Sequence, residues 1–211
     1  MDKIKELYNK IVTALKKLYN RYSDVILPTV VLLAICIVVT LALSSTNLLT
    51  RGPIAKITAE NNQKAMQKVL EAESYTQQTL TLDGVDYTYN IAANGEEIVG
   101  YIFISAANGY GGNVSVMTAI NPDGSVKAVE ILDVSNETPG LGQNATKPGF
   151  YEQFIGKSCE TSVVKNGAVA EKGEVDAITG ATITSKAVSR AVNEALRLTQ
   201  NIISTEGGDE Q

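Results

Sequence analysis

The segment from Val25 to Thr50 contains no charged residue. Its apolar part, Val25 to Leu43, would form roughly 28 Å of helix at about 1.5 Å per residue, which matches the hydrocarbon core of a bilayer. Pro28 would lie in the first turn of this helix, where its missing N–H costs little. We therefore expect a transmembrane helix over residues 25–43. A cleaved signal peptide is the alternative, because Ala42-Leu43-Ser44 loosely resembles a cleavage site.

The charges on either side of this segment predict its orientation. The chain as a whole carries −5. Residues 1–24 carry +3, so the remaining residues carry −8. Because basic flanks stay in the cytoplasm, residues 51–211 should lie outside the cell membrane as an extracytoplasmic domain. The acidic balance argues against nucleic acid as a partner. The charged residues of the first segment are Lys3, Lys5, Lys10, Lys16, Lys17 and Arg21 against Asp2, Glu6 and Asp24.

Residues 1–24 also have the spacing of an amphipathic helix, with apolar residues three or four positions apart. A basic amphipathic helix before a membrane span would lie on the inner leaflet, with membrane lipid as its partner. Packing against a partner protein is the alternative, and the sequence does not choose between them. The apolar positions are Ile4, Leu7, Tyr8, Ile11, Leu15, Leu18, Tyr19 and Tyr22.

The composition limits the chemistry of the chain. It has no histidine, which excludes Ser-His-Asp and Cys-His catalysis, histidine-ligated haem and nearly every catalytic zinc site. Its two cysteines cannot hold an iron–sulfur cluster, and no metal site is expected. Cys36 lies in the span and Cys159 beyond it, so they cannot pair within one chain, and we expect Cys159 to be a small buried apolar residue. Any redox chemistry would therefore need an organic cofactor.

Short strand-like runs and one long amphipathic helix predict an α+β domain, an antiparallel sheet with helices packed against it. The expected helices cover 57–72, 150–155 and 183–203, and the expected strands cover 87–92, 98–106, 114–120 and 125–132. The predicted organisation is a cytoplasmic helix over 1–24, the span over 25–43, a linker over 44–56, the domain over 57–203 and a disordered acidic tail over 204–211.

One segment, Asp176-Ala177-Ile178-Thr179-Gly180-Ala181-Thr182, directly precedes the predicted long helix. Its small residues would let the backbone approach a bulky group. Thr182 would present a hydroxyl at a helix N-terminus, where free N–H groups and the helix dipole favour a phosphate. Helix capping is the alternative from the same residues, since Thr182, Thr184 or Ser185 could each cap the helix.

This segment resembles the flavinylation motif of the FMN-binding domain family, Asp-x-x-Ser/Thr-Gly-Ala-Thr. In that family a flavin transferase attaches FMN through a phosphoester to the final threonine. The fixed positions of the motif are matched by Asp176, Thr179, Gly180, Ala181 and Thr182.

Two further segments resemble the same family. Glu137-Thr138-Pro139-Gly140-Leu141-Gly142 resembles its flavin-facing loop, and Tyr110-Gly111-Gly112 resembles its Gly-Tyr-Gly-Gly turn. Pro139-Gly140 also suits a type II turn, and Gly111-Gly112 a bend between strands. Over most of residues 60–200 the chain is similar to the G subunits of Rnf complexes, membrane-bound ion-pumping ferredoxin:NAD+ oxidoreductases. The C subunits of sodium-translocating NADH:quinone reductases share the motif and are the alternative.

The resemblance implies an electron-transfer subunit that completes no reaction alone and has no catalytic residue of its own. Its covalent FMN would be held by Thr182, and its partners would be the other membrane and redox subunits and, during maturation, a flavin transferase. Asp176 would assist recognition or metal-assisted attachment, or be a buried structural carboxylate. Gly180 and Ala181 would leave room for the phosphate and ribityl chain. The isoalloxazine would be lined by Leu132, Lys147 and the residues from Glu137 to Gly142.

Two other classes of protein remain open at this point. One is a membrane-anchored, non-redox structural module, and the other is a sensor that binds free FMN reversibly.

Overall fold

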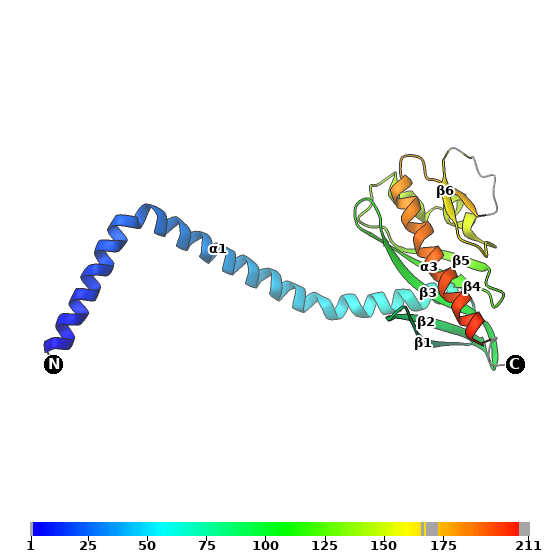
Figure 1. Ribbon diagram of the computed structural model, residues 1–211, viewed down its shortest axis with the longest axis horizontal. Helices are drawn as coiled ribbons and strands as arrows, with labels where there is room; N and C mark the ends of the chain where they lie inside the picture. The colour runs from blue at the N-terminus through cyan, green and yellow to red at the C-terminus, as the bar shows by residue number, and fades with distance from the viewer. Residues whose placement is uncertain (1, 166, 168–172, 207–211) are drawn as a thin grey trace. The chain divides into compact units, whose positions relative to one another are not determined.

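A computed structural model describes residues 2–165, 167 and 173–206 of the chain (Figure 1). The chain divides into two compact units, one ending at Thr58 and the other beginning at Ala59. The first helix, α1 (Asp2–Val69), begins in the first unit and ends in the second. Among the described residues, it is the one helix long and apolar enough to cross a membrane. The apolar side chains of residues 27–43 are exposed, as contact with lipid requires.

Helix α1 is longer than the sequence predicted. The residues expected to form a linker, 44–56, are helical, so α1 unites the helices expected over 1–24 and 25–43 with most of the helix expected over 57–72. Pro28 therefore lies inside a helix rather than in its first turn. The polar residues after the span are compatible with a helix because their hydroxyls bond back to the preceding turn. Thr46 Oγ1 donates to the carbonyl of Ala42 at 2.9 Å, and Thr50 Oγ1 donates to that of Thr46 at 3.0 Å.

The second unit contains a five-stranded antiparallel sheet with strand order β1-β2-β3-β4-β5. Each of the four predicted strands is present; the first three are extended at one or both ends, and the strand predicted over 125–132 is shifted by one residue to 126–133. The strand β1 was not predicted, because its residues are mostly threonine and glutamine and it lies exposed at the edge of the sheet. The strands are β1 (Ser74–Leu82), β2 (Val85–Asn94), β3 (Glu97–Asn108), β4 (Asn113–Ile120) and β5 (Val126–Asp133).

Both faces of the sheet are covered. The long helix α3 (Thr182–Glu206) packs on one face, where Phe103 and Val116 of the sheet meet Val188 and Val192 of the helix, all essentially inaccessible (Figure 1). The end of α1 packs on the other face against a second apolar cluster. That cluster contains Val69, Leu70, Ala92, Ile102, Met117 and Ala119. Helix α3 continues to Glu206, past the predicted domain end, and residues 207–211 of the predicted tail lie outside the described residues.

Between β5 and α3 the chain forms short elements that surround the start of α3. They are the 3-10 helix η1 (Gly142–Thr146), α2 (Pro148–Tyr151), the 3-10 helix η2 (Glu152–Phe154), and the parallel strands β6 (Ser162–Val164) and β7 (Glu174–Asp176). The sequence did not predict β6 and β7, which have three residues each.

A polar network ties this region to α3. Thr161 N–H donates to Asn193 Oδ1 at 2.7 Å, and Ser189 Oγ donates to the carbonyl of Thr161 at 3.0 Å. These bonds fix the segment before β6 against the helix.

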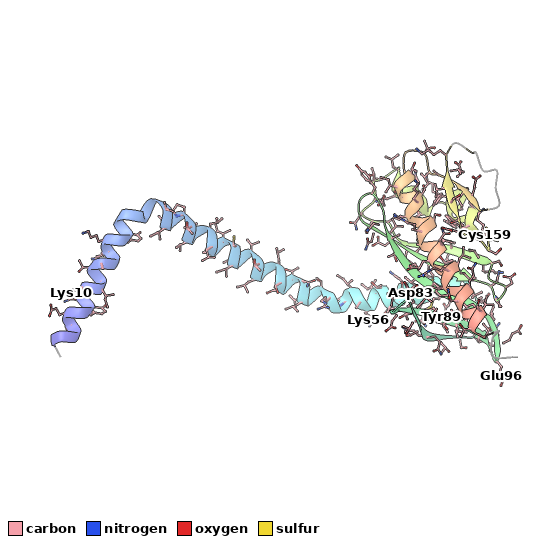
Figure 2. All side chains as sticks on the ribbon, viewed as in Figure 1. Lys10, Lys56, Asp83, Tyr89, Glu96 and Cys159 are labelled. Atoms are coloured by element: carbon pink, nitrogen blue, oxygen red, sulfur yellow. The ribbon has the colours of Figure 1, made fainter. Side chains whose placement is uncertain are left out.

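Cys159 lies in the loop between η2 and β6, and its side chain is exposed (Figure 2). The expectation that it would be buried was therefore wrong. The apolar character of the thiol favoured burial, but Cys159 lies in an exposed stretch of the loop together with its neighbours Ser158 and Glu160.

Candidate functional site

Thr182 is not the N-cap residue of α3. The helix begins at Thr182, and the residue before it, Ala181, has no hydroxyl. Ser185 instead connects the start of the helix to the preceding turn. Its Oγ accepts the N–H of Ile178 and donates to the carbonyl of Ala181, both at 3.0 Å. Among the described residues, the Thr182 hydroxyl has no hydrogen-bond partner, and the residue is half-buried. Its hydroxyl is therefore available for other chemistry.

Two similar turns, over residues 138–141 and 178–181, lie in contact near the start of α3. In one, Leu141 N–H donates to the carbonyl of Thr138 at 3.1 Å; in the other, Ala181 N–H donates to that of Ile178 at 2.9 Å. The third residue of each turn is a glycine with φ of +76°, namely Gly140 and Gly180. This geometry confirms the type II turn predicted at Pro139-Gly140. A Cβ on Gly180 would lie 3.0 Å from Leu141 Cδ2, so the two turns are in close contact.

The segments that resemble the FMN-binding family converge on one cavity of about 540 Å³, a volume typical of a small-molecule site. Three apolar side chains of its lining, Tyr110, Leu141 and Ile183, are 72%, 41% and 51% exposed. Exposed apolar groups around a cavity suit a flat, largely apolar ligand. The lining consists of Tyr110, Glu137, Thr138, Leu141, Gly142, Gly180, Ala181, Thr182, Ile183 and Thr184.

A single buried carboxylate connects the walls of this cavity. Glu137 is 3% exposed. Its Oε1 accepts the N–H of Gly111 at 2.9 Å, and its Oε2 accepts the hydroxyl of Thr184 at 2.5 Å. Glycines surround it closely, since a Cβ on Gly109 would lie 2.3 Å from Oε1 and one on Gly142 would lie 2.5 Å from Oε2. Glu137 thus joins the Tyr110 turn, the loop after β5 and the first turn of α3.

The environment of Glu137 makes its stability contribution pH-dependent. Burial raises the pKa of the carboxyl, but hydrogen bonds from Thr184 and from the backbone N–H groups of Gly111, Tyr110 and Gly112 outweigh burial and hold the pKa below its ordinary value of 4.5. A carboxyl with a depressed pKa stabilises the fold fully above its ordinary value, and this contribution is lost as pH falls through the lower, folded value.

We therefore expect Glu137→Gln to flatten the acid side of the stability profile. Below about pH 5 the free energy of unfolding of the wild type should fall more steeply than that of the variant. Urea unfolding of the full chain in detergent at a series of pH values measures the difference. Parallel profiles would contradict this assignment, because the other carboxyls with depressed pKa, Asp123 and Asp133, are present in both proteins.

Several predicted site residues line a neighbouring cavity instead. Gly140, Lys147, Asp176 and Thr179 lie around a cavity of about 460 Å³ that also includes Gln153. Asp176 is half-buried; its N–H donates to Gln153 Oε1 at 2.8 Å. The Asp176 carboxylate accepts the N–H of Gly167 at 3.0 Å. These contacts connect Asp176 to η2 and to Gly167, as a structural carboxylate would be connected.

Leu132 is not brought to the cavity. It packs with the cluster under α1, on the sheet face opposite α3, whereas its neighbour Ile131 packs on the α3 side. Adjacent residues of a strand point to opposite faces of the sheet, so the prediction of Leu132 chose the residue on the wrong face. Gly111 and Gly112 are not among the residues that line the cavity, and Asn136 packs directly against both.

Two residues of the cavity were not predicted as site residues. Thr184 was considered only as a helix cap, and Ile183 only as the first residue of the long helix. Their positions in the first turn after the motif are the sole sequence signal for either residue.

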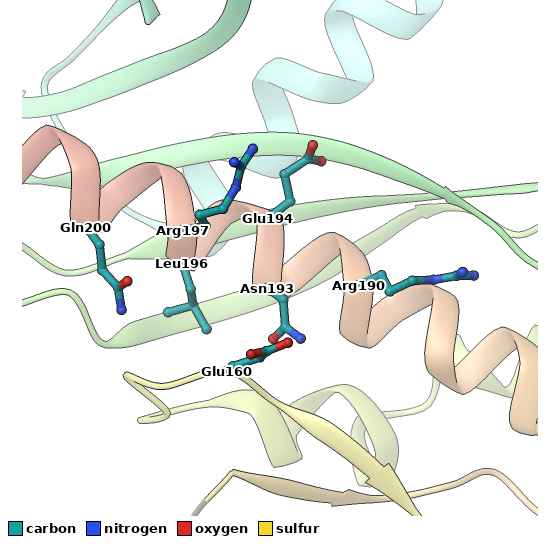
Figure 3. Close-up of a pocket in the computed structure, with 7 residues that line it drawn as sticks. All are labelled: Glu160, Arg190, Asn193, Glu194, Leu196, Arg197 and Gln200. Carbon is teal, nitrogen blue, oxygen red and sulfur yellow. The ribbon is translucent and has the colours of Figure 1, made fainter. Parts of the chain in front are cut away.

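A separate groove of about 360 Å³ runs along α3 near the segment before β6 (Figure 3). It combines acidic and basic side chains, including Glu160, Arg190 and Arg197. Arg190 Nη2 donates to the carbonyl of Asn108 at 2.6 Å, and Arg197 pairs with Asp83 at 3.4 Å. These arginines therefore serve contacts within the domain, and the groove contains no residue of the resembling motifs.

Comparison with known proteins identifies the family. Residues 109–197 match the FMN-binding domain family, a range that contains all three resembling segments. The chain is 35% identical to the G subunit of the Na+-translocating ferredoxin:NAD+ oxidoreductase complex of Acetobacterium woodii, over 82% of this chain and 90% of that protein. It is 36% identical to the proton-translocating counterpart of Clostridium ljungdahlii, over 63% of this chain and 74% of that protein. A crystal structure of NqrC from Shewanella oneidensis superposes with a TM-score of 0.49 at 19% identity, covering 66% of this chain and 73% of that one. On the sequence relationship to the two G subunits, the chain belongs to the G-subunit family of ion-translocating ferredoxin:NAD+ oxidoreductase complexes and contains an FMN-binding domain.

Proposed function

We propose that this protein is the electron-transfer subunit of an Rnf-type ion-translocating ferredoxin:NAD+ oxidoreductase and carries FMN as a phosphoester on Thr182. The observation that carries the proposal is the position of this hydroxyl. Thr182 lies at the first position of α3, lines the 540 Å³ cavity, and has no hydrogen-bond partner among the described residues. The names of the related G subunits supply the class of complex.

The residues present fit FMN. A phosphoester between the Thr182 oxygen and the phosphate of FMN would form with net loss of water, the hydroxyl giving up its proton and the phosphate one oxygen. The first N–H groups of α3 lie at the helix end that favours a phosphate. The small residues Gly180 and Ala181 leave the preceding backbone open to the phosphate and ribityl chain. Tyr110, Leu141 and Ile183 provide apolar surface for the ring. When bound, FMN supplies the redox chemistry that the chain's own side chains lack.

Denaturation tests the proposal against the two other classes of protein. Protein produced together with a flavin transferase is unfolded in denaturant, desalted and examined by absorbance. We expect the flavin to remain with the chain. A flavin that is lost on unfolding would instead identify a reversible FMN sensor, and a chain without flavin beside a positive transferase control would identify an anchored structural module.

We also propose that α1 anchors the protein in the membrane with residues 1–24 on the cytoplasmic side, lying on the inner-leaflet lipid. The +3 charge before the span and the acidic domain after it support this orientation. The remaining subunits of the complex would be the electron-transfer partners, and a flavin transferase would act on the exported domain.

The two cysteines provide a test of the orientation. Cys159 is exposed in the FMN-binding unit, and Cys36 lies in the apolar segment. We expect a membrane-impermeant maleimide to label the wild type in intact cells and to leave Cys159→Ser unlabelled, because lipid shields Cys36. In a cell with an outer membrane, that membrane is first made permeable. Labelling of Cys159 only after lysis would reverse the proposed orientation.

A further inference from the structure

Glu137 is a buried carboxylate that attachment of FMN to Thr182 does not itself require. Its hydrogen bonds go to two separate walls of the cavity, the Gly111 N–H of the Tyr110 turn and the Thr184 hydroxyl of α3. Among the described residues, none of the ion pairs includes Glu137. A buried charge without a cationic partner is costly to retain, which calls for a specific role.

We propose that Glu137 is a positioning residue that holds the Tyr110 turn against the first turn of α3 and sets the reduction potential of the flavin in the cavity between them. The inference rests on the proposed function for the presence of the flavin. Its structural half, the connection of the two walls, concerns the chain alone.

The glycines around Glu137 show how closely the site is built for a carboxylate. Side chains at Gly109 or Gly142 would approach its oxygens to 2.3 and 2.5 Å, far inside van der Waals contact. Gly109 N–H also donates to the carbonyl of Gly112 at 2.7 Å, which closes the turn that carries Tyr110. The position of the Tyr110 ring at the cavity therefore depends on a turn that Glu137 anchors.

The charge of Glu137 has a separate effect from its hydrogen bonds. Because it lines the cavity and is paired with no described cation, its negative charge opposes the addition of electrons to a ligand there. Glu137 would thus lower the reduction potential of the flavin. Hydrogen bonds and charge can be separated by substitution, because glutamine retains the shape and can accept from Gly111 while donating to the Thr184 oxygen.

The test compares Glu137→Gln, Glu137→Ala and Thr184→Val with Glu97→Gln, an exposed residue at the far end of β3. Hydrogen exchange of residues 109–113 is measured in full-length protein made without transferase. We expect about tenfold faster exchange in Glu137→Ala and Thr184→Val, because each variant removes a hydrogen bond between Glu137 and a wall of the cavity. Exchange in Glu137→Gln and Glu97→Gln should equal that of the wild type.

The reduction potential of the flavin is then titrated in the loaded proteins. We expect Glu137→Gln to favour reduction by about tenfold in the equilibrium constant, equivalent to about 30 mV for a two-electron couple. Glu97→Gln should match the wild type. A wild-type potential in Glu137→Gln, or wild-type exchange in both Glu137→Ala and Thr184→Val, would overturn the proposal. A wild type without flavin would instead refute the proposed function. The exchange experiment would still test whether Glu137 holds the Tyr110 turn against the first turn of α3.

Discussion

Replacing Thr182 with valine is expected to abolish covalent attachment of FMN while leaving the domain folded. Valine has nearly the shape of threonine but no hydroxyl, so no phosphoester can form. The fold should tolerate the change, because the Thr182 hydroxyl makes no hydrogen bond among the described residues and the start of α3 is held by Ser185. Intact mass of the purified chain, produced with a flavin transferase, measures the result directly.

Two further variants make this result specific to one oxygen. Thr182→Ser retains a hydroxyl at the same position and should recover attachment at least in part. Thr146→Val removes an exposed hydroxyl from η1, outside the motif and outside the cavity lining, and should retain the added mass. An added FMN mass in Thr182→Val would show that the phosphoester is elsewhere and would return the segment before α3 to a purely structural role.

Much of the sheet could be predicted because its signals are local. The strands β2 to β5 alternate in burial or form apolar runs, and turn residues such as Asn94-Gly95 separate them. The strand β1 has no such pattern, since it is an exposed edge strand. The parallel strands β6 and β7 have three residues each, which is too short for a periodic pattern to be recognised.

In the candidate site, too, the residues within short motifs could be predicted, whereas contacts between distant segments could not. Thr182 and the two glycine turns were located through short motifs, whose residues are adjacent in sequence. The role of Glu137 was not predictable, because its partners Gly111 and Thr184 come from different parts of the chain and meet only in the fold. The same limit explains Lys147 and Asp176, which are near the site in sequence yet face the neighbouring cavity.

Gly111→Ala is expected to cause the largest loss of stability among the loop glycines that lack a positive φ. A Cβ on Gly111 would lie 1.9 Å from the carbonyl oxygen of Asn136 and 2.8 Å from its carbonyl carbon. Both atoms belong to the backbone, so no side-chain rotation relieves the overlap. The turn cannot move away without breaking the bond from Gly111 N–H to Glu137. We expect a cost of about 3 kcal/mol or more, since overpacking against fixed atoms ranks among the most destabilising changes.

Gly149→Ala is the matched control. Gly149 lies in α2 and adopts no positive φ, and a Cβ added to it would have no atom within 4 Å, so alanine should be neutral or stabilise by up to about 1 kcal/mol. For a chain of this size, the loss in Gly111→Ala corresponds to roughly 6–12 °C in Tm. Thermal unfolding of the full chain in detergent, followed by circular dichroism, measures both variants. Equal Tm values would mean that the backbone at Asn136 moves freely. The Tyr110 turn would then be too mobile to form a wall of the cavity, and the role assigned to Glu137 would fail with it.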